Sequence, residues 1–287
     1  MTAASASGAR LPTFLVIGAM KSGTSSLRDY LRAHPDVYVP PEEELHYFAE
    51  GINWSKGLDW YRSRFADAGD AIAVGEKSPT YTMVPEHPGV PERIAALLPD
   101  ARLLYVVREP IARIRSHFVH QFGRGHEHLP IARAVREDAR YLDTTRYAMQ
   151  LDRYLDWFPA EQLMVITSEQ LDHERAATFR RIAEFCGVDP DVELAALDQR
   201  SHESSSKQVP VGVTARLRNI PAIRKAAEAL PAPIRSRIGA ATRRELQAEE
   251  LDLDASTQAW IIDQLRPDLV GLRRWLGDDF AAWGYAD

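Results

Sequence analysis

Residues 13–31 have the sequence TFLVIGAMKSGTSSLRDYL, and this stretch indicates the fold. Its first part, residues 13–18, is a continuous apolar run, as expected of a strand that is buried on both faces. Gly18 and Gly23 then enclose a short loop, and a helical pattern follows. A buried strand, a glycine loop and a helix in this order can bind an anion, because the loop amides and the helix N-terminus point at the same place.

Three further apolar runs resemble the first one, at residues 71–77, 101–107 and 162–168. Helical patterns lie between and after these runs, at residues 25–33, 91–98, 111–122, 145–158 and 176–185. The alternation predicts an α/β fold of three layers, with a central parallel sheet flanked by helices. Ligands of such folds bind at the carboxyl ends of the strands, so we look for chemistry there.

The composition excludes several classes of protein. The chain has 287 residues, of which 45% are hydrophobic and 26% charged, and a formal net charge of −6. The negative charge argues against a nucleic-acid-binding protein. A single cysteine excludes a disulfide scaffold, and we expect Cys186 to be a small buried hydrophobe. We find no signal peptide or membrane-spanning run and therefore expect a cytoplasmic protein.

The chain is expected to form one domain over residues 11–287, preceded by a disordered tail of residues 1–10. Residues 200–254 are expected to form a variable basic segment that serves as a lid over the cofactor or contacts the acceptor. Within it, residues 200–244 carry ten Lys and Arg against two Glu, a net charge of +8, so the rest of the chain carries −14. This charge belongs to solvated helix faces with a few cofactor contacts, or it meets an anionic acceptor or a membrane surface. Residues 255–283 predict a closing helix hairpin.

The lysine of the first loop distinguishes it from an ATP-binding P-loop, in which Lys directly follows the second glycine. Here Thr24 follows Gly23, and the lysine is Lys21. The pattern G-x-x-K-x-G-T-S resembles the 5′-phosphosulfate loop of sulfotransferases, which use 3′-phosphoadenosine 5′-phosphosulfate (PAPS). The resemblance implies that Lys21 stabilises charge on the leaving phosphate. It further implies that the 5′-phosphate is held by Lys21, Ser22, Gly23, Thr24 and Ser25.

A second pattern resembles the 3′-phosphate site of the same family. Arg108 ends the run 101–107, and Ser116 follows eight residues later on the next helix. A guanidinium can bind a phosphate through two hydrogen bonds, and a hydroxyl supplies another donor. Arg113 and Arg115 are alternatives for this role, and an ordinary strand-end ion pair is an alternative for Arg108. The resemblance also places Lys207, in a loop over the nucleotide, on phosphate oxygens.

Two further motifs resemble elements of the heparan-sulfate-type sulfotransferases. In ELHYF (44–48), the resemblance implies that Glu44 takes the proton from the acceptor, with His46 as a rival base or a helper. We expect the bulky residues after Glu44 to anchor it in the core. In EKSPTY (76–81), the resemblance implies that Lys77 faces the reaction centre, where it could pair with Glu44. Tyr147 either lines the site or packs in the core.

Together these motifs imply a sulfotransferase that moves a sulfuryl group from PAPS to a hydroxyl or amine by in-line displacement, without a metal. The acceptor would be a small molecule or a glycan. The resemblance covers most of the chain except residues 200–254, where the disulfide-braced glycine-rich lid of the heparan enzymes is absent. Two alternatives remain, a P-loop nucleotide kinase or NTPase and a catalytically inactive PAP-binding protein.

Overall fold

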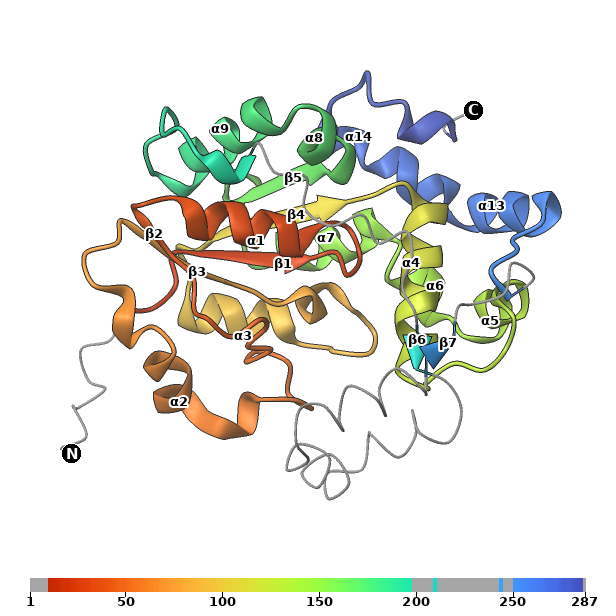
Figure 1. Ribbon diagram of the computed structural model, residues 1–287, viewed down its shortest axis with the longest axis horizontal. Coiled ribbons are helices and arrows are strands. Elements are labelled where there is room, and N and C mark those ends of the chain that lie inside the picture. Colours follow the sequence, from red (N-terminus) through yellow and green to blue (C-terminus); the bar gives the residue numbers. More distant parts are fainter. Residues whose placement is uncertain (1–9, 198–208, 211–242, 245–249, 286–287) are drawn as a thin grey trace. The chain divides into compact units, whose positions relative to one another are not determined.

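The computed structural model describes residues 10–197, 209–210, 243–244 and 250–285 (Figure 1). The chain divides into two compact units. The first comprises residues 1–109, 143–201 and 265–287, and the second comprises residues 110–142 and 202–264. Most of the predicted basic segment and of the predicted N-terminal tail lie outside the described residues. The single domain over residues 11–287 stays a prediction.

The first unit is built on a five-stranded sheet. The strands are β1 (Phe14–Gly18), β2 (Val37–Tyr38), β3 (Ala73–Lys77), β4 (Arg102–Val107) and β5 (Leu163–Thr167). Their order in the sheet is β2-β3-β1-β4-β5, and every pair is parallel. From β1 the chain therefore first forms β2 and β3 on one side of this strand, and it later forms β4 and β5 on the other side. Such a reversal at the carboxyl end of a central strand is where α/β sheets bind ligands.

Helices cover both faces of this sheet (Figure 1). Those of the first unit are α1 (Thr24–Ala33), α2 (Gly57–Ser63), α3 (Val90–Leu97), α7 (Tyr147–Leu155), α8 (Ser168–His173), α9 (Arg175–Cys186) and α14 (Arg273–Leu276). Right-handed crossovers that run in opposite directions along a sheet put their helices on opposite faces. Accordingly α1, α8 and α9 bury their apolar residues against one face, with Phe14, Leu104 and Ile166. On the other face, Tyr147 of α7 meets Tyr105 edge to face.

The second unit contains α4 (Pro110–Gly123), α5 (Ile131–Glu137), most of α6 (Arg140–Asp143) and the first part of α13 (Ala255–Gly271). It also contains the antiparallel pair β6 (Val209–Pro210) and β7 (Arg243–Arg244). A buried carboxylate, Glu127, accepts hydrogen bonds from the Tyr141 hydroxyl and from two backbone amides. Its oxygens are thus satisfied within this unit, as a buried carboxylate requires.

The predicted α/β fold with a parallel sheet is confirmed, and the four apolar runs are β1, β3, β4 and β5. The sequence analysis missed β2, because its two residues are too short to show a periodicity. The predicted hairpin over residues 255–283 is wrong. One long helix, α13, is followed after Leu272 by the short α14, which stops at Gly277 with φ +96°. Cys186 is buried, and burial raises its pKa to about 12.

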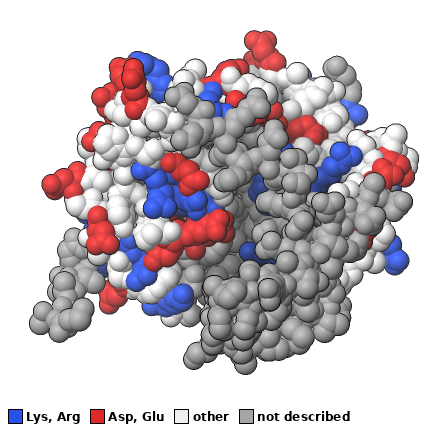
Figure 2. Space-filling view, viewed as in Figure 1, with Lys and Arg blue, Asp and Glu red and all other residues white. Residues whose placement is uncertain are grey.

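Lys and Arg side chains are interspersed with Asp and Glu side chains on the described surface that Figure 2 shows. Among the residues that the structure describes, no helix has the length and apolar character needed to span a membrane.

Candidate active site

The loop between β1 and α1 lies at the carboxyl end of the central strand. Its start continues the sheet, because the Ala19 amide donates to the Val106 carbonyl over 2.7 Å. Lys21 (φ +71°) and Gly23 (φ +95°) both adopt left-handed backbone, which turns the chain sharply into α1. Gly18 is required by close approach, since a Cβ there would lie 2.0 Å from Thr82 Oγ1 and 2.8 Å from the Tyr105 ring.

This loop fits the 5′-phosphate group of PAPS. The ten-residue helix α1 begins at Thr24 and has no acidic residue in its first turn, so its positive end faces the loop uncompensated. Ser22 is fully buried, and its hydroxyl has no hydrogen-bond partner among the described residues. Because a buried hydroxyl without a partner is costly, a ligand oxygen would satisfy a real deficit here.

Arg108 lies beside this loop, as the prediction requires. Its Nη1 donates to the Lys21 carbonyl over 3.3 Å, and its own carbonyl accepts from the Tyr147 hydroxyl over 2.8 Å. Of the two roles predicted for Tyr147, lining the site or packing in the core, the structure favours packing, because its ring is fully buried. Its hydroxyl holds the backbone of Arg108.

The other residues predicted for the 3′-phosphate site belong to the second unit. Ser116 is half-buried on α4, and its pairing with Arg108 stays a prediction. Of the rival arginines, Arg113 is fully buried and donates to the Tyr141 carbonyl over 2.8 Å, so it belongs to the core of that unit. Arg115 is exposed on α4. Lys207 lies outside the described residues.

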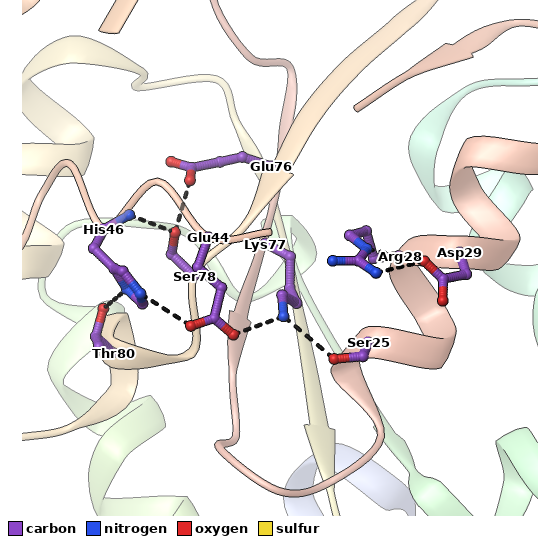
Figure 3. Close-up of polar contacts among 9 residues, drawn as sticks. All are labelled: Ser25, Arg28, Asp29, Glu44, His46, Glu76, Lys77, Ser78 and Thr80. Atoms are coloured by element: carbon purple, nitrogen blue, oxygen red, sulfur yellow. Dashed lines mark hydrogen bonds and ion pairs between the residues drawn. The ribbon is translucent and has the colours of Figure 1, made fainter. Parts of the chain in front are cut away.

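The second group of polar side chains gathers at the end of β3 (Figure 3). The Lys77 ammonium donates to Glu44 Oε1 over 2.6 Å and to Ser25 Oγ over 3.4 Å. The other carboxylate oxygen, Oε2, lies 2.9 Å from His46 Nε2. The predicted contact between Lys77 and Glu44 is therefore present, and His46 shares the same carboxylate. Parallel pairing of Val16 in β1 with Lys77 brings this lysine next to the phosphate-type loop.

The contacts of Glu44 set its protonation. Burial by itself raises the pKa of Glu44, but the hydrogen bond from His46 and the charge and hydrogen bond of Lys77 outweigh it. The pKa of this carboxyl falls from 4.5 to about 2. Glu44 is therefore ionised at neutral pH, with an exposed side-chain fraction of 32% that leaves it open to an incoming molecule.

The bulky residues after Glu44 anchor it, as expected. Leu45, Tyr47 and Phe48 are all buried, and the Tyr47 ring stacks on Tyr61 with a centroid distance of 4.2 Å and an interplanar angle of 10°. Between these anchors His46 adopts φ +48°, an unusual value for a residue with a Cβ. The loop that carries the candidate base is thus fixed on both sides of His46.

Three polar residues of this region were not assigned a role by the sequence analysis. Thr80 Oγ1 lies 2.9 Å from His46 Nδ1, Ser78 Oγ accepts from the His46 amide over 2.9 Å, and Glu76 accepts from Ser78 Oγ over 2.7 Å. All three belong to the EKSPTY motif, so their place in a family-like motif was the available signal. The local pattern does not reveal which partner each one meets.

Comparisons with known proteins identify the family of this chain. A family model described as the sulfotransferase domain matches residues 11–225. The chain is 33% identical over 188 residues to human heparan sulfate glucosamine 3-O-sulfotransferase 6, covering 62% of this chain and 53% of that protein. It is 32% identical over 202 residues to bovine bifunctional heparan sulfate N-deacetylase/N-sulfotransferase 2, covering 63% and 22% respectively.

A solved structure shares the fold. The crystal structure of a sulfotransferase from Alicyclobacillus acidocaldarius superposes with a TM-score of 0.69 at 24% identity, covering 96% of this chain and 99% of that one. Since the family model matches more than half of the chain, the chain belongs to the sulfotransferase family. It spans about half the length of the 3-O-sulfotransferases that it matches.

Proposed function

We propose that this protein is a PAPS-dependent sulfotransferase that transfers a sulfuryl group to a hydroxyl or amine. The observation that carries the proposal is the ion pair between Glu44 and Lys77, 2.6 Å long, beside a phosphate-type loop that contains Lys21. PAPS, when bound, supplies the activated sulfuryl group and leaves as 3′-phosphoadenosine 5′-phosphate (PAP). All remaining tasks fall to side chains and amides of this chain.

In the first unit, the nucleotide would be held by the loop after β1, by the start of α1 and by Arg108 after β4. The amides of Ser22 to Ser25, the Ser22 hydroxyl and the end of α1 bind the 5′-phosphate. Lys21 stabilises the negative charge that grows on this phosphate as it leaves. Arg108 binds the 3′-phosphate. Ser116 and Lys207 stay predictions for this role, since Ser116 belongs to the second unit and Lys207 lies outside the described residues. A charge positioned at the leaving phosphate, such as that of Lys21, is worth about 10²–10³-fold in rate.

Glu44 is the proposed general base. A carboxylate with a pKa of about 2 is a weak base, whereas general bases work best when their pKa lies near the operating pH. His46 and Lys77 cause the low pKa of Glu44. An anionic group that competes for the Lys77 ammonium therefore weakens the contact between Lys77 and Glu44, and the basicity of Glu44 rises. Lys77 therefore links binding of the sulfuryl donor to activation of the base. His46 is proposed to orient the acceptor, and it is the alternative general base to Glu44.

No finding supports the kinase or NTPase alternative, since Thr24 occupies the position where the ATP motif has its lysine. The acceptor is part of the proposal. Several of the relatives are named for heparan sulfate glucosamine, so a glucosamine-containing glycan is the first acceptor to test, followed by small-molecule hydroxyls and amines. The absence of a metal likewise stays a prediction.

The proposal is tested by thermal unfolding with PAP, AMP and ATP, because a ligand raises the melting temperature according to its affinity. PAP should bind much more tightly than AMP, since only PAP has a 3′-phosphate. The preference should fall in Arg108→Ala by roughly tenfold to a hundredfold, the value of a charged hydrogen-bonded contact. Arg181→Ala, which removes an exposed arginine from α9 of the same unit, is the matched control. Equal shifts with PAP and AMP would contradict the proposal.

A further inference from the structure

Glu76 is a buried carboxylate that the proposed chemistry does not use. It precedes Lys77 on β3, and adjacent strand residues point to opposite faces, so its side chain points away from the Lys77 ammonium and from Glu44 (Figure 3). Its exposed fraction is 2%, and burial raises its pKa despite three hydroxyl donors. A buried carboxylate of this kind costs stability unless it is well hydrogen-bonded, so its partners are informative.

The three donors converge on Glu76 from different elements. The Tyr61 hydroxyl of α2 and the Tyr81 hydroxyl each donate to Oε1 over 2.8 Å, and the Ser78 hydroxyl donates to Oε2 over 2.7 Å. All three donors are fully buried. Because the hydroxyl protons are committed to Glu76, the oxygen atoms of these groups can only accept further hydrogen bonds.

Each of these hydroxyl-bearing residues in turn contacts one residue of the loop that carries Glu44. Ser78 Oγ accepts from the His46 amide over 2.9 Å, and the Tyr81 hydroxyl accepts from the Phe48 amide over 3.4 Å. Tyr61 stacks against Tyr47, which lies between them. Three consecutive residues, 46, 47 and 48, are therefore tied to one carboxylate.

We propose that Glu76 is a positioning residue, whose carboxylate fixes Ser78, Tyr61 and Tyr81 so that they hold residues 46–48 and keep Glu44 and His46 at Lys77. The proposal rests on the proposed function, because it assumes that the held groups perform the reaction. It explains why the strand end has two ionisable residues in succession. Lys77 contacts the candidate base directly, and Glu76 holds the loop through its hydroxyl partners.

A carboxylate performs this task where an amide cannot. Its two oxygens accept all three hydroxyl protons, whereas the side-chain amide in Glu76→Gln would present one oxygen and one NH₂ donor. This NH₂ group would compete with a hydroxyl donor, so Ser78 or Tyr81 would have to reorient. The His46 or Phe48 amide would then lose its acceptor. His46 is sensitive to this loss because its backbone has the uncommon φ of +48°.

The test measures amide hydrogen exchange of the full-length protein by NMR. In Glu76→Gln we expect the protection of the His46 and Phe48 amides to fall about fivefold to tenfold, the value of one lost hydrogen bond. Turnover should fall at least tenfold, while the affinity for PAP changes less than twofold. Glu127→Gln is the matched control, since Glu127 is also a buried carboxylate with three donors but belongs to the second unit. It should leave the protection of residues 46–48 unchanged.

Ser78→Ala provides an independent measurement in case Glu76→Gln does not fold. It should lower the protection of His46 but not that of Phe48. Unchanged protection of both amides in Glu76→Gln, or of His46 in Ser78→Ala, would overturn the proposal. An equal loss of PAP affinity and turnover in a variant that is folded would also overturn it, because a residue that positions the base should lower turnover and leave PAP binding intact. Failure of the proposed function would appear separately, as a wild-type protein without preference for PAP over AMP.

Discussion

Glu44 has two hydrogen-bond donors, one on each oxygen of its carboxylate. Lys77 and His46 keep it ionised, and its partial exposure leaves it accessible. Each oxygen still has a lone pair that can accept a proton, but the two donors lower the basicity of the carboxylate. The chemistry of the residue is therefore set by its partners as much as by its own type.

For the base, we predict that Glu44→Gln retains PAP binding and loses about 10²–10⁴-fold in turnover, since the amide cannot accept the acceptor proton. The matched control is Glu43→Gln, which removes an exposed neighbouring carboxylate and should have normal turnover. Both variants are compared by PAP release in the presence of acceptor and by thermal shift with PAP. Normal turnover of Glu44→Gln would move the role of base to His46.

For the loop, we predict that Gly18→Ala destabilises the protein by about 2 kcal/mol or more, as overpacking in a well-packed region does. The added Cβ would collide with Thr82 Oγ1, and displacement of the loop should also weaken PAP binding. Gly51→Ala is the control, because nothing lies within 4 Å of its added Cβ. Urea unfolding and thermal shift with PAP measure the two effects. Wild-type stability of Gly18→Ala would show that the close packing around Gly18 is not required.

At the scale of elements, a carboxylate of α13 binds the start of α7, the helix that supports Arg108. Asp268 of α13 accepts from the Ala148 amide over 3.0 Å and from the Met149 amide over 2.8 Å. These amides belong to the first turn of α7 and have no partner within that helix. The carboxylate thus caps α7, whose Tyr147 hydroxyl donates to the Arg108 carbonyl.

This cap predicts a pH dependence. Burial raises the pKa of Asp268 from 3.8 to about 6, although the Met149 and Ala148 amides oppose the shift. The folded protein therefore holds this proton more tightly than the unfolded chain does. As pH rises from 4 to 6, the free energy of unfolding of the wild type should therefore fall relative to that of Asp268→Asn. The expected fall is about 2 kcal/mol, a value reduced because the side chain is partly exposed.

The control for this measurement is Asp263→Asn on the same helix, where the carboxylate is exposed. Urea unfolding of the three proteins at pH 4, 5, 6 and 7 gives the comparison. A difference between wild type and Asp268→Asn that does not vary with pH, or varies with the opposite sign, would contradict the pKa of Asp268.

At the scale of the whole molecule, Glu44 contributes to acid stability with the opposite sign. Its pKa is about 2 in the folded protein and near 4.5 in the unfolded chain, so its ion pair stabilises the fold above pH 4.5. This contribution should be lost between pH 4.5 and pH 2. Relative to Glu44→Gln, the wild type should lose about 2 kcal/mol across this window, a value reduced for solvent screening. Glu43→Gln serves again as control, and parallel curves for wild type and Glu44→Gln would contradict the ion pair.

Much of the fold could be predicted from the sequence. The strands β1, β3, β4 and β5 are buried on both faces, so each appears as an apolar run long enough to recognise. The short β2 has no such run. The predicted hairpin at the C-terminus failed because apolar periodicity does not indicate where a helix ends. Here Gly277 stops α14 after four residues.

The candidate site was only partly predictable. Arg108 directly follows β4 and Lys21 lies in the short loop after β1, so their place at the sheet edge follows from the α/β pattern. Glu44 has no such strand before it, and its position came from a resemblance of motifs. Glu76 has the same apolar surroundings in sequence as Lys77, and its role as an acceptor for three hydroxyls could not be predicted.

The sequence by itself determined the parallel α/β sheet, the glycine loop and the residues that follow each strand, because burial and backbone conformation leave a local periodic pattern. The pairing of Lys77 with Glu44, thirty-three residues away, was expected only from a resemblance of motifs. The tertiary structure alone decided that the partners of Glu76 hold the loop of residues 46–48. Such pairings depend on the order and register of strands and on the packing of an irregular loop. These are long-range properties, and no local spacing of residue types specifies them.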